Sequence, residues 1–251
     1  MRFLAAREYP PKARFSDSRP GDNATPGKTG HSANVVTTTE KKRHASRVVR
    51  SLKKEYPQAK CSLNFDNPLQ LLLATILSAQ CTDKRVNQVT EKLFQKYHTA
   101  ADFGRMPLVT LEKAIKSTGF FRNKAKNIKA CCQTLSDRYH GEVPADLDDL
   151  IGLAGVGRKT ANVVLGNAFG IVSGVVVDTH VSRLSHRLGL SQKTSAEKIE
   201  SDLNAQLPKK EWIEFSHRMI QHGRLVCLAR RPRCQTCSLI KFCPQIDVDK
   251  K

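Results

Sequence analysis

Four cysteines near the end of the sequence have the types and spacing of a metal-binding group. Cys227, Cys234, Cys237 and Cys243 follow the pattern C-x6-C-x2-C-x5-C. Four thiolates can bind either zinc or an iron–sulfur cluster. The first residues lack the long apolar run of a secretory signal, and clustered cysteines inside a cell bind metal more often than they pair. The residue types therefore predict a metal site, with zinc and a cluster both open.

The cysteine segment is also rich in arginine, and no acidic residue lies within it. Arg230, Arg231 and Arg233 stand between the cysteines. The chain has 42 Lys and Arg against 23 Asp and Glu, a formal net charge of +19, and residues 1–40 hold only six of the basic and four of the acidic residues. A folded body with this excess expects a polyanionic partner, usually nucleic acid. A basic but uninvolved surface is the alternative.

A second group that could do chemistry is the stretch LAGVGRKTANVV. Gly155 and Gly157 form a turn between two expected helices, and Arg158 and Lys159 follow at the start of the second. Missing side chains let backbone N–H groups approach an anion, and the start of a helix carries partial positive charge. The stretch predicts a phosphate-binding turn. A plain connection between two helices is the alternative.

Helices must position these groups, because helical periodicity dominates after residue 40. Residues 1–40 contain Pro, Gly, Ser and Thr without a sustained apolar period, and predict a disordered extension. The stretch DNPLQLLLATILSAQ predicts a central buried helix, capped by Asp66 or Asn67 with Pro68 in its first turn. Further helices are expected at about 83–97, 108–117, 123–139, 158–168, 179–188, 195–206 and 211–223.

The remaining patterns favour an all-α, membrane-free protein. Only IVSGVVVD has the composition of a strand, and a single strand has nothing to pair with. No segment approaches the roughly 18 apolar residues of a membrane span. We expect an intracellular monomer in the cytoplasm or nucleoid. The acid-poor start offers an organelle transit peptide as the alternative, against which Glu8, Asp17 and Asp22 argue.

Several segments together resemble the endonuclease III family of DNA glycosylases. LAGVGRKTANVV is similar to the helix-hairpin-helix of that family, and VVVDTHVSRLSHRLGL to the segment with its aspartate. The four cysteines have the spacing of its iron–sulfur loop, and LLLATILSAQCTDKRVN and STGFFRNKAKNI resemble two segments that enter the DNA duplex. The match runs in uninterrupted order over residues 45–245. It departs from the family at Ala154, where proline usually makes the turn more rigid.

The resemblance implies a two-lobed, all-α helix-hairpin-helix glycosylase fold. One domain, residues 61–172, would carry the duplex-entering segments and the hairpin. The other, residues 41–60 plus 173–247, would hold a [4Fe–4S] cluster on the four cysteines. The cluster would be structural, and its loop would present Arg230, Arg231 and Arg233 to DNA phosphates.

The resemblance also implies that Lys159 is the nucleophile and Asp178 its partner. A lysine amine can form an imine with an opened sugar. Neutralising a free lysine at pH 7 costs roughly 4.6 kcal/mol, and the helix start and Arg158 would both disfavour the ammonium form. Asp178 would accept a proton and stabilise positive charge on the sugar. The alternatives are that Lys159 only neutralises a phosphate and that Asp178 only caps a helix.

Further residues are implied to open the duplex, because such an enzyme must take its target base out of the stack. Gln80 and the loop with Phe120, Phe121 and Arg122 would fill the space that the base leaves. Phe120 stands where the family usually has an aliphatic side chain, and an aromatic ring can stack on bases for about 1–3 kcal/mol. Both phenylalanines could instead be core residues. Asp83 would lie near the lesion pocket or cap the following helix.

The implied activity is removal of oxidised pyrimidines from double-stranded DNA. Cleavage on the 3′ side of the abasic site would follow by β-elimination through the Lys159 imine. Two alternatives remain open. An adenine-removing relative lacks the lysine and has a further C-terminal domain, whereas this sequence stops eight residues after Cys243. A non-catalytic helix-hairpin-helix module would use the turn for phosphates alone.

Overall fold

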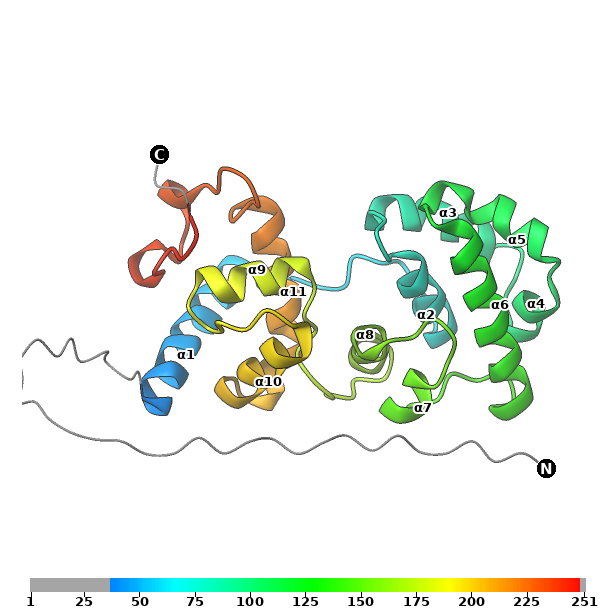
Figure 1. Ribbon diagram of the computed structural model, residues 1–251, viewed down its shortest axis with the longest axis horizontal. Coiled ribbons are helices and arrows are strands. Elements are labelled where there is room, and N and C mark those ends of the chain that lie inside the picture. Colours follow the sequence, from blue (N-terminus) through cyan, green and yellow to red (C-terminus); the bar gives the residue numbers. More distant parts are fainter. Residues whose placement is uncertain (1–36, 249–251) are drawn as a thin grey trace, which may run out of the picture. The chain divides into compact units, whose positions relative to one another are not determined.

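The computed structural model describes residues 37–248, and within that range helices and loops are present without any strand (Figure 1). The predicted all-α fold is confirmed. Residues 171–178, which have the composition of a strand, run without regular secondary structure between two helices. Residues 1–36 of the predicted disordered extension lie outside the described residues. Its last four residues, 37–40, form the start of a helix.

The first helix, α1 (Thr38–Glu55), begins with a capping box. The Glu40 backbone N–H donates to the Thr37 hydroxyl, and the Thr37 N–H donates to the Glu40 carboxylate. These reciprocal bonds start a helix even where the preceding residues lack apolar periodicity. The extension predicted over residues 1–40 is therefore too long at its C-terminal end.

A helix is present at each later position where one was predicted, and α4 (Ala100–Arg105) and the short 3-10 turns are additional. In chain order the later elements are α2 (Pro68–Leu77), α3 (Asp83–Phe94), α4 (Ala100–Arg105), α5 (Leu108–Ile115), η1 (Lys116–Thr118), α6 (Phe121–Arg138), α7 (Leu147–Ile151), α8 (Arg158–Ala168), α9 (Thr179–Arg187), α10 (Ala196–Gln206), η2 (Lys209–Glu211), α11 (Trp212–Leu225), η3 (Cys234–Thr236) and η4 (Ile240–Phe242).

The first of two hydrophobic cores is built around α2. Eight of the ten residues of α2 are buried, as its continuous Leu and Ile content predicts. The Asn67 side chain caps the helix and Pro68 occupies its first turn, as expected. Helices α3, α6 and α8 pack against α2, while α4 and α5 pack on α6 and α7 packs on α8, and the core draws on residues 63–165. We call this part of the molecule the first lobe.

The second core brings together segments that are far apart in the sequence. Val48 and Leu52 of α1 pack with Val181 and Leu184 of α9 and with Phe215 of α11. This core draws on residues 45–59 and 175–239, and we call it the second lobe. Figure 1 shows α1 beside α9, α10 and α11, apart from α2 to α8. The two-lobed fold is as the resemblance predicted.

Two connections, residues 56–67 and 169–178, join the lobes. Within residues 37–248, every helix falls short of the length or the apolar character that crossing a bilayer requires.

Candidate active site

The glycine turn is held in the shape that an anion site requires. Gly155 has φ +76°, and a Cβ there would lie 2.8 Å from the Cβ of Asn127, so a larger residue would be strained twice over. Gly157 is the N-cap of α8 and, being glycine, has no side chain to accept from the N–H groups of the helix. Open space surrounds the position of its missing Cβ. The first N–H groups of α8 therefore lack a side-chain acceptor at the N-cap, which leaves them available to an anion.

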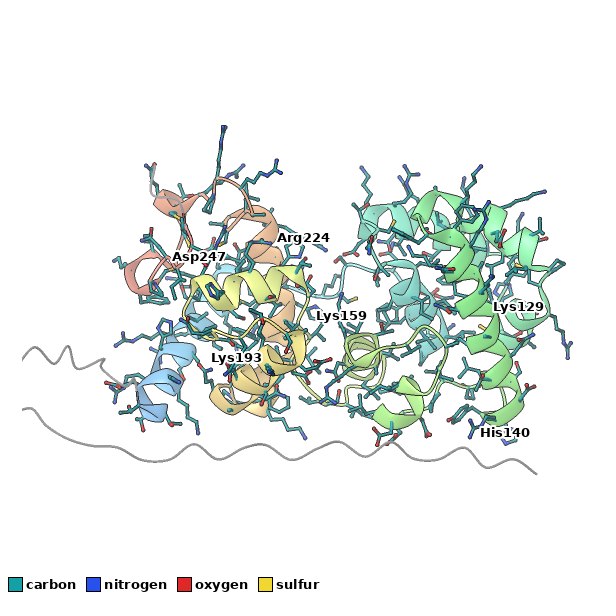
Figure 2. The ribbon with its side chains drawn as sticks, viewed as in Figure 1. Lys129, His140, Lys159, Lys193, Arg224 and Asp247 are labelled. Carbon is teal, nitrogen blue, oxygen red and sulfur yellow. The ribbon has the colours of Figure 1, made fainter. Side chains whose placement is uncertain are left out.

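Lys159, the second residue of α8, is exposed and lines a cavity of about 300 Å³ together with Asp178. Lys159 belongs to the first lobe, and Asp178 lies at the start of α9 in the second. Figure 2 places Lys159 between the two groups of helices. Among the described residues the two side chains form no ion pair. Packing of the two lobes thus brings an amine and a carboxylate to one cavity.

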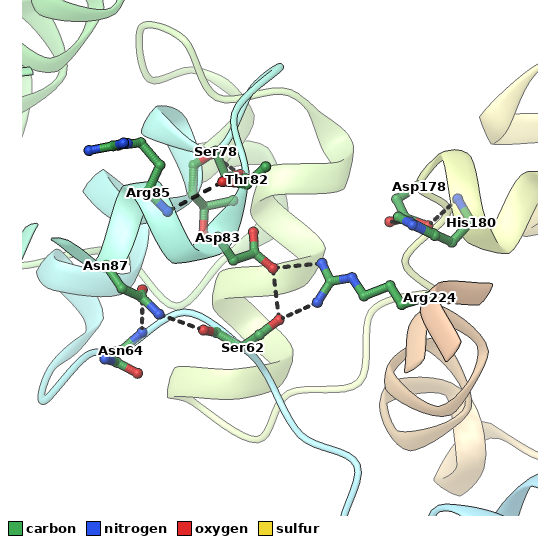
Figure 3. A network of polar contacts seen from close by, with 11 residues as sticks. Ser62, Asn64, Ser78, Thr82, Asp83, Arg85, Asn87, Asp178, His180 and Arg224 are labelled. Carbon is green, nitrogen blue, oxygen red and sulfur yellow. Dashed lines mark hydrogen bonds and ion pairs between the residues drawn. The ribbon is translucent and has the colours of Figure 1, made fainter. Parts of the chain in front are cut away.

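Asp178 is both a helix cap and a cavity residue. One carboxylate oxygen, Oδ1, accepts the backbone N–H groups of His180 and Val181 at 2.9 and 2.8 Å. The other, Oδ2, lies 2.9 Å from the His180 Nδ1 (Figure 3). Burial alone would raise the pKa of Asp178, but these hydrogen bonds and the positive charges of His180 and Lys159 leave the pKa below its ordinary value. Asp178 is therefore ionised at neutral pH.

Arg158, which was predicted to contact the DNA backbone, pairs with a carboxylate of the second lobe. Its guanidinium donates two hydrogen bonds to the Glu200 carboxylate, at 3.1 and 3.2 Å, and Glu200 is 6% exposed. A buried carboxylate on α10 takes both bonds because an unpaired charge there would be costly. Arg158 therefore joins the two lobes, and the negative charge of Glu200 lies beside the guanidinium that was predicted to disfavour the ammonium form of Lys159.

Asp83 lines the same cavity as Lys159, near its predicted position. Its Oδ2 accepts hydrogen bonds from the Ser62 hydroxyl and from the Arg224 guanidinium, both at 2.7 Å (Figure 3). The alternative that Asp83 caps α3 is wrong, because Thr82 is the N-cap. Arg224 reaches Asp83 from α11 in the second lobe.

The two loops predicted to enter DNA are exposed and have unusual backbones. Gln80 has φ +52°, and Phe120, which is 66% exposed, has φ +47°. Phe121 packs against the first core, with the Arg122 guanidinium 5.1 Å from its ring centre. The alternative of a core residue therefore holds for Phe121 and not for Phe120. Neither Gln80 nor Phe120 lines the cavity with Lys159.

The chain is similar to known proteins over most of its length. A family model described as the HhH-GPD superfamily of base excision DNA repair proteins matches residues 73–209. Endonuclease III of Synechocystis sp. is 53% identical over 81% of this chain and 93% of its own length. Endonuclease III of Bacillus subtilis is 49% identical over 75% of this chain and 86% of its own.

The chain belongs to the endonuclease III family.

Solved structures of endonuclease III extend the likeness to the fold. A structure of a non-covalent endonuclease III–DNA complex is 47% identical, with a TM-score of 0.78 over 81% of this chain and 95% of that one. A trapped endonuclease III–DNA covalent intermediate has the same identity and TM-score, over 81% of this chain and 96% of that one. The family assignment made from the sequence is confirmed.

The four cysteines of this endonuclease III family member line one small, apolar cavity of about 20 Å³. Burial raises the pKa of the Cys237 thiol to about 11. Burial also raises the pKa of the Cys243 thiol above its ordinary value. Within residues 37–248, no group of three or more His, Cys, Asp or Glu side chains is placed to hold a metal ion.

Two buried side chains that the sequence did not single out lie within hydrogen-bonding distance of the sulfurs. Arg187, 8% exposed, lies 3.4 Å from the Cys227 Sγ and also donates to the Leu228 and Ala229 carbonyls. His222 Nε2 lies 3.4 Å from the Cys237 Sγ. No local pattern in the sequence marks either residue, because each lies on a helix whose contact with the cysteines is set by packing.

The loop between the first two cysteines exposes its arginines. Arg230, Arg231 and Arg233 are all exposed, and Arg231 has φ +51°. The carbonyl groups at 228 and 229 are held by Arg187. The three guanidinium groups are thus available at the surface of the second lobe.

Proposed function

We propose that this protein is a base-excision repair enzyme that removes oxidised pyrimidines from double-stranded DNA and then cleaves the strand. The single observation that carries the proposal is the cavity between the lobes, which Lys159 and Asp178 both line. A lysine amine at the start of a helix beside an ionised carboxylate can open a sugar and stabilise the charge that develops. The solved covalent and non-covalent DNA complexes of endonuclease III support the same conclusion.

In the first step the Lys159 amine attacks C1′ of the damaged nucleotide. The bond between C1′ and the base breaks, and the base leaves with the electron pair and takes up the proton that the amine loses. Positive charge develops on the sugar ring, where the Asp178 carboxylate stabilises it. A carboxylate with a lowered pKa is a weak base, so Asp178 acts chiefly through its charge.

In the second step the opened sugar forms an imine with Lys159. Loss of a proton from C2′ expels the 3′ phosphate by β-elimination, which cleaves the strand on the 3′ side. Water then hydrolyses the imine and returns Lys159 to its free form. The turn at Gly155 and Gly157 holds a neighbouring phosphate against the open N-terminus of α8.

The target base enters the cavity after it leaves the stack. The cavity, at about 300 Å³, is at the lower end of ordinary ligand sites, which suits one base. Asp83 lies at its edge and can bond to the polar edge of an oxidised pyrimidine. Gln80 and Phe120 fill the space left in the duplex, with Phe121 and Arg122 supporting the second of these loops.

The four cysteines hold a [4Fe–4S] cluster in this proposal. The residues fit it, because four thiols line one apolar cavity and each would bind a different iron, so the four need not converge on a single ion as the ligands of zinc must. The buried Arg187 can balance negative charge on the Cys227 sulfur. The cluster supplies four iron–thiolate bonds that cross-link a loop of short 3-10 turns, with no hydrolytic role. The loop can then offer Arg230, Arg231 and Arg233 to phosphates. Iron and sulfide analysis should find four of each per chain, and zinc alone would contradict the assignment.

Reduction with borohydride in the presence of abasic-site DNA tests the activity. The wild-type protein should form a covalent adduct and Lys159→Ala none, whereas Lys193→Ala, at an exposed lysine between α9 and α10, should react as the wild type does. A non-catalytic DNA-binding module would give no adduct at all. Release of adenine in preference to oxidised pyrimidines would instead indicate the adenine-removing relative.

A further inference from the structure

Lys124, on α6, is a buried ammonium group that the proposed chemistry does not use. Lys124 is only 5% exposed, and its Nζ donates to the carbonyl oxygens of Leu77 and Thr118, both at 2.8 Å. No carboxylate among residues 37–248 pairs with it. Burial lowers the pKa of Lys124, and the nearby Cys81 acts in the opposite direction. A buried cation retained without an acid is held by these two carbonyls.

Each of the two carbonyl groups belongs to the last residue of a helical element. Leu77 is the last residue of α2, and Thr118 is the last residue of η1. Carbonyl groups at the end of a helix lack an N–H donor within it, and their partial negative charge attracts a cation. One ammonium group therefore caps two C-terminal ends that belong to different parts of the chain.

The residues that follow these two ends are the ones proposed to enter the duplex. Gln80 comes three residues after Leu77, and Phe120 two residues after Thr118. Both have positive φ without being glycine, +52° and +47°. Such backbone conformations persist only where the surroundings fix them. The Lys124 side chain hydrogen-bonds to the residues that precede both loops.

We propose that Lys124 is a positioning residue for the opening of the duplex. Its ammonium group fixes the spacing between the Gln80 and Phe120 loops, so that both side chains enter the DNA together. Lys124 itself is buried and touches neither the base nor the reacting sugar. The inference rests on the proposed function of the two loops.

Lys129 provides a matched control on the same helix. Its Nζ also donates to two carbonyl oxygens, those of Gly104 and Met106, at 2.8 and 2.7 Å. These carbonyls belong to the end of α4 and to the residue after it, and neither precedes a duplex-entering loop. Lys129 is partly buried, and its loss reports the structural cost of removing an ammonium group on α6 that bonds two carbonyls, without disturbing the loops.

The test compares Lys124→Gln, Lys124→Arg and Lys129→Gln on two substrates under single turnover. One is a duplex with an oxidised pyrimidine, and the other a single strand with an abasic site, where there is no partner strand to separate. Rates are normalised to the fraction of enzyme that borohydride can trap. Lys124→Gln should slow base removal from the duplex by about tenfold or more and cleavage of the single strand by less than about twofold.

Two comparisons decide the outcome. Lys124→Arg, which keeps the charge, should recover part of the loss, and Lys129→Gln should change both reactions by the same small factor. If Lys124→Gln slows both reactions equally, or no more than Lys129→Gln does, Lys124 is only structural and the inference is wrong.

Fluorescence of 2-aminopurine opposite the lesion separates this inference from the function on which it rests. Wild-type protein should raise the signal as the loops enter, and Gln80→Ala, Phe120→Ala and Lys124→Gln should each reduce the rise. If the loop variants change neither signal nor rate, the proposed role of the loops fails and Lys124 with it. If they impair both and Lys124→Gln does not, only the role of Lys124 fails.

Discussion

Two helix starts face the cavity between the lobes, and they are closed in opposite ways. The start of α8, after Gly157, has no side-chain cap, and the space around the Cβ position of Gly157 is open. The start of α9 is filled by the Asp178 carboxylate, which takes two of its N–H groups. An open start can accept a phosphate from outside, whereas a closed one holds its own carboxylate in place and ionised. In the proposed function, a helix start would thus serve DNA binding in the first lobe and catalysis in the second.

The largest effect should come from Asp178→Asn. Asparagine caps a helix as well as aspartate does, so the free energy of unfolding should change by less than about 1 kcal/mol. Loss of the negative charge beside the sugar should slow base removal by about 10²–10³-fold. Thermal unfolding and single-turnover rates measure the two effects. A variant with normal rates would mean that Asp178 is only a cap.

A smaller effect is expected when the open helix start is made to resemble the closed one. Gly157→Asp adds a capping carboxylate at a residue whose φ of −94° any residue adopts. The helix should gain a few tenths of a kcal/mol, but the added charge should repel phosphate and weaken DNA binding by about tenfold. Binding titrations against Gly157→Ala, which adds bulk without charge, isolate the repulsion. Equal affinity of the two variants would argue against a phosphate at this turn.

The carboxylate at α9 should also respond to pH through His180. The pKa of Asp178 lies below its ordinary value, so the ionised form and the contacts it makes are lost only as the pH falls through that lowered pKa. His180→Ala removes a hydrogen bond and a positive charge that lower this pKa. The acid limb of the pH–rate profile should therefore move to higher pH. An unmoved limb would show that another group controls it.

The smallest expected effect is a difference between Arg231 and Arg158 in the salt dependence of DNA binding. Arg231 is exposed, so Arg231→Ala should reduce the salt dependence of DNA binding by about one unit of slope. Arg158 is held by Glu200, so Arg158→Ala should leave that slope unchanged and lower stability, because it leaves a buried carboxylate unpaired. Binding constants over a range of salt concentrations and thermal unfolding distinguish the two. The reverse pattern would place Arg158 on the DNA.

Most of the helices could be predicted because their signals are local. Asn67 and Pro68 mark the start of α2, and its continuous apolar residues mark its burial. The six residues of α4 were missed because so short a segment contains too few turns for apolar periodicity to emerge. Thr37 and Glu40 show the opposite case, in which two polar residues start a helix within a segment that composition assigned to a disordered extension.

The candidate site was predicted where residue type and spacing carry the chemistry, and missed where packing does. Gly155, Gly157 and Lys159 form one short stretch, so their pattern was visible. Arg224, which meets Asp83 across the lobes, had no comparable signal, because one arginine on an amphipathic helix has the pattern of a solvated surface residue.

The sequence by itself determined the helices, the glycine turn and the set of four cysteines, because caps, periodicity and spacing act over a few residues. Tertiary structure alone decided that Lys159 and Asp178 share a cavity and that Arg158 pairs with Glu200. It also decided that the Lys124 ammonium group bonds the last carbonyl groups of both α2 and η1. These contacts join residues from separate helices, and only the burial of two hydrophobic cores brings those helices together.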